Sequence, residues 1–151
     1  MKYNPKLEVA IRASVEAGKV LMENFNDQKR VTTIKESLRD VSSKVDELAE
    51  NVIIEILTKH DNSISIITEE QGNVVNKSKD KYWLIDALDG TVNYLNKIPF
   101  FCVSIAYIEN NIIQTSAIYA PFYSDLYFAS RGIGSFKNHK KLTSKDSKFS
   151  D

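Results

Sequence analysis

The sequence is poor in several features that would favour particular classes of protein. It holds one cysteine among 151 residues, so an internal disulfide is excluded and a reducing compartment is expected. Its 20 basic and 20 acidic residues balance, which gives no electrostatic argument for binding nucleic acid or an anionic membrane. No window approaches the ~18 apolar residues of a membrane span, and no long apolar stretch follows Met1 as in a signal peptide. We therefore expect a cytoplasmic protein that binds neither nucleic acid nor membrane.

The first part of the chain carries the pattern of two amphipathic helices. Apolar residues recur at steps of three and four from Leu7 to Phe25, with Asn4 as a cap and Pro5 in the first turn. A second stretch with the same spacing runs from Val45 to Leu57, and Ser43 is its expected cap. We interpret the polar segment 26–40 between them as extended or loop.

The rest of the chain favours strands. Apolar and β-branched runs predict strands at residues 64–68, 83–85, 101–108, 112–119 and 126–129. Asn110-Asn111 predicts a tight turn, Gly132 leads into a last hairpin at 136–142, and the polar stretch 71–81 is expected to be a loop. Because strands follow helices, we predict an α+β fold, with both helices on one face of a mainly antiparallel sheet. Residues 1–145 would form one domain, followed by a polar tail at 146–151.

The feature with the clearest chemical meaning is residues 83–91, WLIDALDGT, where an apolar strand runs into two acids. Buried carboxylates are costly unless paired or bound to a metal, so Asp86 and Asp89 are expected to meet a cation. Gly90 lets the backbone approach a ligand, and the N–H groups of Gly90 and Thr91 can face a phosphate. An alternative remains open, because Asp-Gly is also a common turn dipeptide.

Three further residues have both a chemical and a structural explanation. Glu69 follows another apolar run and could join Asp86 and Asp89 as an oxygen ligand of a hard cation, although adjacent acids usually lie in a solvated loop. Asp46 is better explained, from the residues alone, as part of a capping box with Ser43. Cys102 is interpreted as a small core residue.

One phosphatase mechanism is excluded by spacing. Enzymes that form an aspartyl-phosphate have an apolar strand followed by Asp-x-Asp-Gly-Thr. Here the spacing is Asp86-x-x-Asp89, and Ala87 stands where the nucleophilic carboxylate would be needed. We therefore reject a covalent intermediate.

The motifs together resemble those of the inositol monophosphatase family. Residues 83–94, WLIDALDGTVNY, are similar to the family signature W-I-x-D-P-x-D-G-T-x-N-F. The pair Glu69-Glu70 and the segment from Asp40 to Glu50 resemble upstream elements of that family. Later elements follow in the same order at 99–106, 118–121 and 132–136, so the similarity covers nearly all of residues 1–145.

The resemblance implies a magnesium site. Glu69, Asp86 and the backbone carbonyl of Leu88 would hold a first Mg²⁺, while Asp86 and Asp89 would share a second. Such ions lower the pKa of bound water and neutralise charge on a phosphoryl group.

It also implies the catalytic and supporting roles. Thr91 would orient the attacking water, Asp46 would hydrogen-bond Thr91, and Glu69 would complete the catalytic set. The amides of Gly90 and Thr91 would hold the phosphate, with Glu70 and Lys35 in support.

The implied activity is Mg²⁺-dependent hydrolysis of a phosphate monoester, with inositol monophosphate first among substrates and a homodimer as the expected assembly. Three departures from the family pattern stand out: Ala87 replaces Pro, Ser43 replaces Thr, and the second half of the family, with its Trp-Asp-x-Ala-Ala-Gly element, is absent. The alternative is therefore a non-catalytic metal-binding or dimerisation module of the same family.

Overall fold

The computed structural model describes residues 4–26 and 38–144 of the chain. Within them lie two long helices, α1 (Pro5–Asn26) and α2 (Leu38–His60), and a short helix α3 (Thr91–Leu95). No helix of the described segments has the length and apolar character needed to cross a bilayer. Lys35 and the tail at 146–151 lie outside the described residues, so the predictions about them stay open.

The first helix begins as predicted. The side-chain oxygen of Asn4 accepts a hydrogen bond from the Lys6 amide at 2.9 Å, and its carbonyl accepts one from the Leu7 amide at 2.9 Å. These bonds satisfy backbone donors that the first turn of a helix leaves free. The predicted start of the second helix near Ser43 is wrong, because α2 already begins at Leu38. The sequence does carry a signal for the earlier start, because Leu38 and Val41 continue the apolar spacing of three and four that leads to Val45.

Eight strands form one sheet in the order β2-β1-β3-β4-β5-β6-β7-β8. Only the pair β1–β3 is parallel among the strand pairs of the described segments, so the predicted mainly antiparallel α+β fold is confirmed. The strands are β1 (Ser65–Thr68), β2 (Gly72–Val75), β3 (Lys81–Asp89), β4 (Cys102–Glu109), β5 (Ile112–Ala120), β6 (Asp125–Ser130), β7 (Gly134–Lys137) and β8 (Lys140–Leu142).

Two strand predictions need correction. The stretch 71–81, expected to be a loop, contains the edge strand β2, whose residues are too exposed to give an apolar alternation. The strand predicted at 83–85 extends to Asp89, so both acids of the motif lie within β3 rather than after it. The turn at Asn110-Asn111 is confirmed, since both residues adopt the positive φ of a tight hairpin turn, 53° and 60°.

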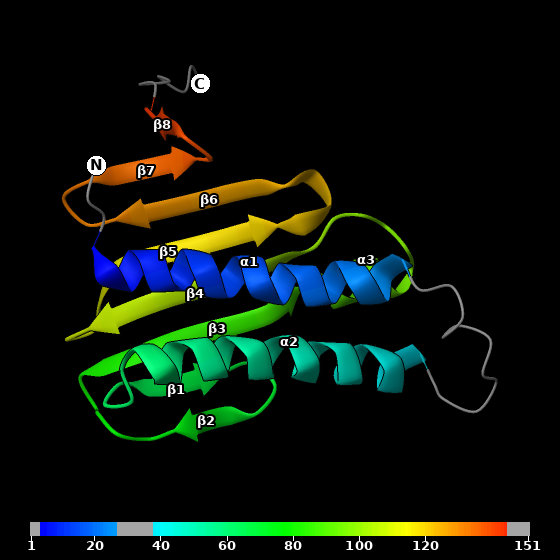
Figure 1. The fold of residues 1–151 in the computed structure, drawn as a ribbon, viewed down its shortest axis with the longest axis horizontal. Coiled ribbons are helices and arrows are strands. Elements are labelled where there is room, and N and C mark those ends of the chain that lie inside the picture. Colours follow the sequence, from blue (N-terminus) through cyan, green and yellow to red (C-terminus); the bar gives the residue numbers. More distant parts are fainter. Residues whose placement is uncertain (1–3, 27–37, 145–151) are drawn as a thin grey trace, which may run out of the picture.

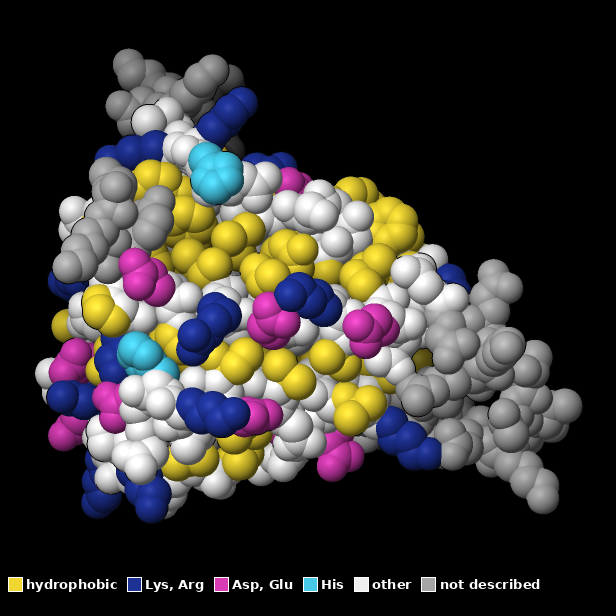
Figure 2. All heavy atoms as spheres, viewed as in Figure 1, with side chains coloured by type: hydrophobic (Ala, Val, Ile, Leu, Met, Phe, Trp, Pro, Cys, Tyr) yellow, Lys and Arg dark blue, Asp and Glu magenta, His cyan; other side chains and the backbone are white. Residues whose placement is uncertain are grey.

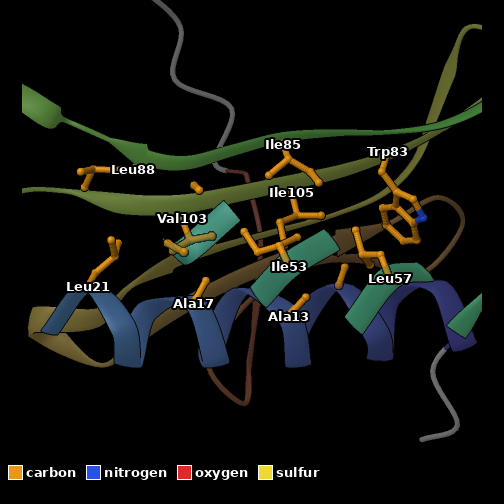
Figure 3. Close-up of a cluster of buried hydrophobic side chains, with 14 of the residues drawn as sticks. Ala13, Ala17, Leu21, Ile53, Leu57, Trp83, Ile85, Leu88, Val103 and Ile105 are labelled. Carbon is orange, nitrogen blue, oxygen red and sulfur yellow. The ribbon is translucent and has the colours of Figure 1, made fainter. Parts of the chain in front are cut away.

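Helices α1 and α2 lie side by side across one face of the sheet (Figure 1). The core forms where they meet β3 and β4, and side chains from all four elements interdigitate there (Figure 3). On the outer surface of the helices, acidic and basic side chains are interspersed and apolar ones gather in bands beside them (Figure 2). The labelled core residues are Ala13, Ala17, Leu21, Ile53, Leu57, Trp83, Ile85, Leu88, Val103 and Ile105.

The opposite face of the sheet carries apolar side chains without a covering helix from the described residues. Trp83 and Ile85 point into the core, so Leu84 between them points away, and it is 49% exposed. Ile118 and Tyr127 are cross-strand neighbours in β5 and β6 and are also exposed. We call this surface, defined by Leu84, Ile118 and Tyr127, the free face.

The contact between α1 and β5 depends on Gly18. A Cβ at this position would lie 2.6 Å from Cδ1 of Tyr119 and 3.2 Å from Cβ of Pro121. We predict that Gly18→Ala lowers the free energy of unfolding by about 1–3 kcal/mol, because overpacking outweighs the ~1 kcal/mol gain in helix propensity. Urea unfolding checks this.

The matched control is Lys19→Ala, one residue further along the same helix and exposed. It should change stability by no more than about 0.5 kcal/mol. A Gly18→Ala variant as stable as the control would show that α1 and β5 can separate without cost.

Candidate active site

A β-bulge in β3 gives Asp86 and Asp89 a common direction. Residues three apart in a regular strand point to opposite faces. Here Asp86 pairs with Ser104 and Asp89 pairs with Cys102, so three steps along β3 match two along β4. The extra residue places both acids on the same side, while Ala87 and Leu88 are buried.

The parallel pairing of β1 with β3 brings Glu69 beside Asp86. Thr68 is in register with Ile85, and the Glu69 amide donates to the Ile85 carbonyl at 3.1 Å, which extends the pairing by one residue. Burial raises the pKa of Asp86 to about 7, and the neighbouring Glu69 carboxyl and the charge of Asp89 add to the rise. The site therefore concentrates negative charge that it does not itself neutralise.

Helix α2 adds Asp46 to this region. Asp46 lies two turns inside the helix and is buried, so its interpretation as a helix cap is wrong. Its pKa is raised to about 7, first by burial and then by the charges of Glu70, Glu50 and Glu69. The side chains of α2 and of the β1–β2 turn thus face one another across the end of the sheet.

Gly90 and Thr91 form the turn that follows β3. Gly90 has a φ of 95°, and a Cβ there would lie 2.8 Å from the carbonyl oxygen of Phe100, so the position requires glycine. The hydroxyl of Thr91 donates to the Leu88 carbonyl at 3.0 Å. The predicted bond from Asp46 to Thr91 is not among the hydrogen bonds of the described residues, and the role of Asp46 stays a prediction.

The helix after this turn is tied to the end of α1. The hydroxyl of Tyr94 donates to the Leu21 carbonyl at 2.7 Å, and the ammonium of Lys97 donates to the Phe25 carbonyl at 2.7 Å. The bond to Phe25 satisfies a carbonyl that the last turn of α1 leaves free, while the bond to Leu21 is a second one to a carbonyl inside the helix. The turn at Gly90 is therefore held from both sides, by β3 and by α1.

The donor chemistry of the site fits a hard cation. Among the described residues, no three His, Cys, Asp or Glu side chains converge closely enough to hold a metal by themselves. Glu69 and Asp86 nevertheless offer oxygen atoms only, and Asp86 also accepts a hydrogen bond from the Leu88 amide at 3.1 Å. Oxygen ligands with unbalanced negative charge suit Mg²⁺, which keeps several water ligands of its own.

Sequence reasoning missed the surroundings of Cys102. It is half-buried beside the acids rather than in the core, with its sulfur 3.5 Å from Oδ2 of Asp89. Burial and the charges of Asp89 and Asp86 raise the pKa of its thiol to about 12, so it stays protonated. The pairing of Cys102 with Asp89 follows from the bulge and has no signal in the sequence.

A pocket of about 520 Å³ opens beside these residues. Asp89 and Gly90 contribute to its wall, together with aromatic and aliphatic side chains of β5, β6 and the turn between them. The pocket adjoins the free face, since Ile118 and Tyr127 line it as well.

Comparison with known proteins gives consistent matches. The model of the inositol monophosphatase family matches residues 2–150. The Nus factor SuhB of Haemophilus influenzae is 37% identical over 139 residues, which is 92% of this chain and 52% of that protein. Its namesake in Escherichia coli strain K12 is 34% identical over the same shares. The chain thus spans about half the length of the curated relatives it matches.

Solved structures agree with this match. The inositol monophosphatase from Anabaena (Nostoc) sp. PCC 7120 aligns with a TM-score of 0.78 at 32% identity, over 93% of this chain and 50% of that one. The extragenic suppressor protein suhB from Bartonella henselae aligns with a TM-score of 0.83 at 28% identity, over 95% of this chain and 56% of that one. Since the family model extends over almost every residue and the fold agrees with solved members, the chain belongs to the inositol monophosphatase family.

Proposed function

We propose that this chain provides the metal- and phosphate-binding part of a Mg²⁺-dependent phosphomonoesterase. The observation that carries the proposal is that Glu69, which follows the end of β1, lies beside Asp86 in the parallel neighbour β3, shortly before the glycine turn at Gly90. Membership of the inositol monophosphatase family supports phosphatase-type chemistry in general.

Each residue has a proposed task. Glu69, Asp86 and the Leu88 carbonyl would hold one Mg²⁺, and Asp86 with Asp89 a second. Bound magnesium would neutralise charge on the phosphate and lower the pKa of water.

Thr91 would orient the attacking water. Its hydroxyl proton is already directed to the Leu88 carbonyl, which leaves its oxygen lone pairs to accept a hydrogen bond from that water. The amides of Gly90 and Thr91 would bind the phosphate, and Asp46 would support Thr91 from α2.

The preferred substrate class is inositol monophosphate. Sugar bisphosphates, nucleotide 3′-phosphates and histidinol phosphate are the competing phosphoesters, and a panel of these compounds ranks them. The pocket beside Asp89 and Gly90 is where the alcohol part would first meet the chain.

The second candidate function is a non-catalytic metal-binding or dimerisation module of the same family. It is favoured by the free face, whose exposed apolar side chains are suited to contact another polypeptide. We propose that a second copy of the chain covers this face in a homodimer.

Asp89→Asn tests the catalytic proposal. It removes one anionic ligand while keeping the shape of the side chain. Phosphate release from inositol monophosphate by the gene product that contains these residues should fall more than about 100-fold, beyond the usual cost of losing an outer-shell partner. Asp80→Asn, an exposed acid just before β3, is the control and should retain activity. Undiminished turnover by Asp89→Asn would rule out the proposed mechanism.

The cation-free chain should lose stability as pH rises from about 4 to about 7. Asp46 and Asp86 have folded-state pKa values above their unfolded ones, so the protonated acids are tolerated and their ionisation opposes folding. Thermal unfolding with a chelator should give a lower Tm at pH 8 than at pH 5. Added Mg²⁺ should raise the Tm more at pH 8 than at pH 5. Asp86→Asn should weaken both effects. A pH-independent Tm and no response to Mg²⁺ would contradict the proposed site.

Ile118→Asp tests the homodimer. Sedimentation velocity should find the unaltered chain as a dimer and this variant as a monomer, because a buried unpaired charge opposes association. Leu48→Asp is the matched control, since Leu48 is similarly exposed but lies on α2 in the other layer. A folded, unaltered chain that sediments as a monomer would reject the dimer.

A further inference from the structure

Tyr94 is a buried phenol that none of the proposed catalytic roles uses. It is 4% exposed and lies in α3, three residues after Thr91. The family signature W-I-x-D-P-x-D-G-T-x-N-F has Phe at this position, so the hydroxyl group is what this chain adds to the ring. A buried hydroxyl lowers stability unless it forms a hydrogen bond, and the bond that it forms here is therefore informative.

The hydroxyl bonds to the interior of α1. It donates to the carbonyl of Leu21 at 2.7 Å, and the two residues are 73 positions apart in the sequence. Leu21 is fully buried and lies more than one turn before the end of the helix. A carbonyl oxygen has two lone pairs, so it can accept this bond in addition to the one within the helix. The bond thus attaches α3 to a fixed part of α1 rather than to its last residue.

The ring of Tyr94 belongs to a cluster of three aromatic side chains. Its centroid lies 5.3 Å from that of Phe25 and 4.9 Å from that of Phe101. The centroids of Phe25 and Phe101 are 5.0 Å apart. Phe25 is in the last turn of α1 and Phe101 directly precedes β4, so three segments distant in the sequence meet at this cluster. Rings at such separations attract one another.

The same segments enclose the phosphate turn. The amide of Tyr94 donates to the carbonyl of Gly90 at 2.9 Å. A Cβ at Gly90 would lie 2.8 Å from the carbonyl oxygen of Phe100 and 3.2 Å from Cα of Phe101, so the turn is packed against that backbone. A shift of Tyr94 away from α1 would therefore move the amides of Gly90 and Thr91 relative to the acids of β3.

We propose that Tyr94 is a positioning residue, whose hydroxyl bond to α1 holds the amides of Gly90 and Thr91 in the orientation that binds phosphate. The inference rests on the proposed function and deepens it, since it assigns the preorganisation of the phosphate turn to a side chain directed away from the phosphate. An anion site with weaker support binds less tightly, because the turn must then be ordered on binding.

The test compares Tyr94→Phe with the unaltered 151-residue chain. One readout is the affinity for inorganic phosphate in the presence of Mg²⁺, followed by NMR titration. The other is hydrogen exchange in the ligand-free chain at the amides of residue 94 and Ile98, whose amide bonds to the Asn93 carbonyl at 2.9 Å. Tyr94→Phe should weaken phosphate binding and speed exchange at both amides about 3- to 10-fold, the effect of one buried hydrogen bond. Exchange at Ile105 in β4 should change less.

Tyr107→Phe is the matched control. Tyr107 is also 4% exposed and lies in β4, and its hydroxyl is 3.5 Å from Oε2 of Glu109 at the end of that strand remote from Cys102. The same atom is lost, so this variant should lower global stability without selectively changing phosphate affinity or exchange at residue 94. If Tyr94→Phe behaves like the control, its hydroxyl contributes only stability and the proposal is overturned.

The remaining outcomes separate this inference from the proposed function. Faster exchange at residue 94 with unchanged phosphate affinity would show that the hydroxyl stabilises α3 without positioning the amides, and the inference alone would fail. An unaltered chain that takes up no phosphate would contradict the phosphate site of the proposed function, and the inference would fall with it. Because Tyr94→Phe keeps the ring and its contacts with Phe25 and Phe101, the variant is expected to fold.

Discussion

Crowding of carboxylates at one end of the sheet is the constraint on which the rest of the site depends. Asp46 and Asp86 both have pKa values raised to about 7, and in each case neighbouring acids add to the effect of burial. Like charges held together in a partly buried region oppose folding unless a proton or a cation compensates them. The scaffold holds these groups together against their repulsion, which is physically reasonable where a divalent cation is to be bound.

Two local irregularities of the sheet make that convergence possible. The bulge in β3 turns Asp86 and Asp89 to one side, and the parallel pair β1–β3 sets Glu69 next to Asp86. A regular antiparallel meander would separate these acids. The remaining strands and the two helices then supply the buried apolar surface that stabilises this crowded end.

The free face connects the fold with the proposed homodimer. Helices of the described residues cover one side of the sheet, while Leu84, Ile118 and Tyr127 leave the other side apolar and accessible. The pocket beside Gly90 opens toward the same side. A polypeptide that covers this face would therefore also close the site, which couples association to substrate binding in the proposed function.

Local residue patterns by themselves determined much of this protein. Apolar periodicity located α1 and the main strands, since burial of one face imposes that spacing, and the Asp86 to Thr91 motif led to the proposed chemistry. The exposed strand β2 escaped prediction because it buries no apolar stripe. The start of α2 at Leu38 was also missed, although Leu38 and Val41 continue the apolar spacing of the helix. Only the tertiary structure decided that three steps along β3 match two along β4, and that Asp46 and Glu50 are both buried. These features depend on backbone register and on contacts between segments far apart in the sequence, so no local pattern of residues predicts them.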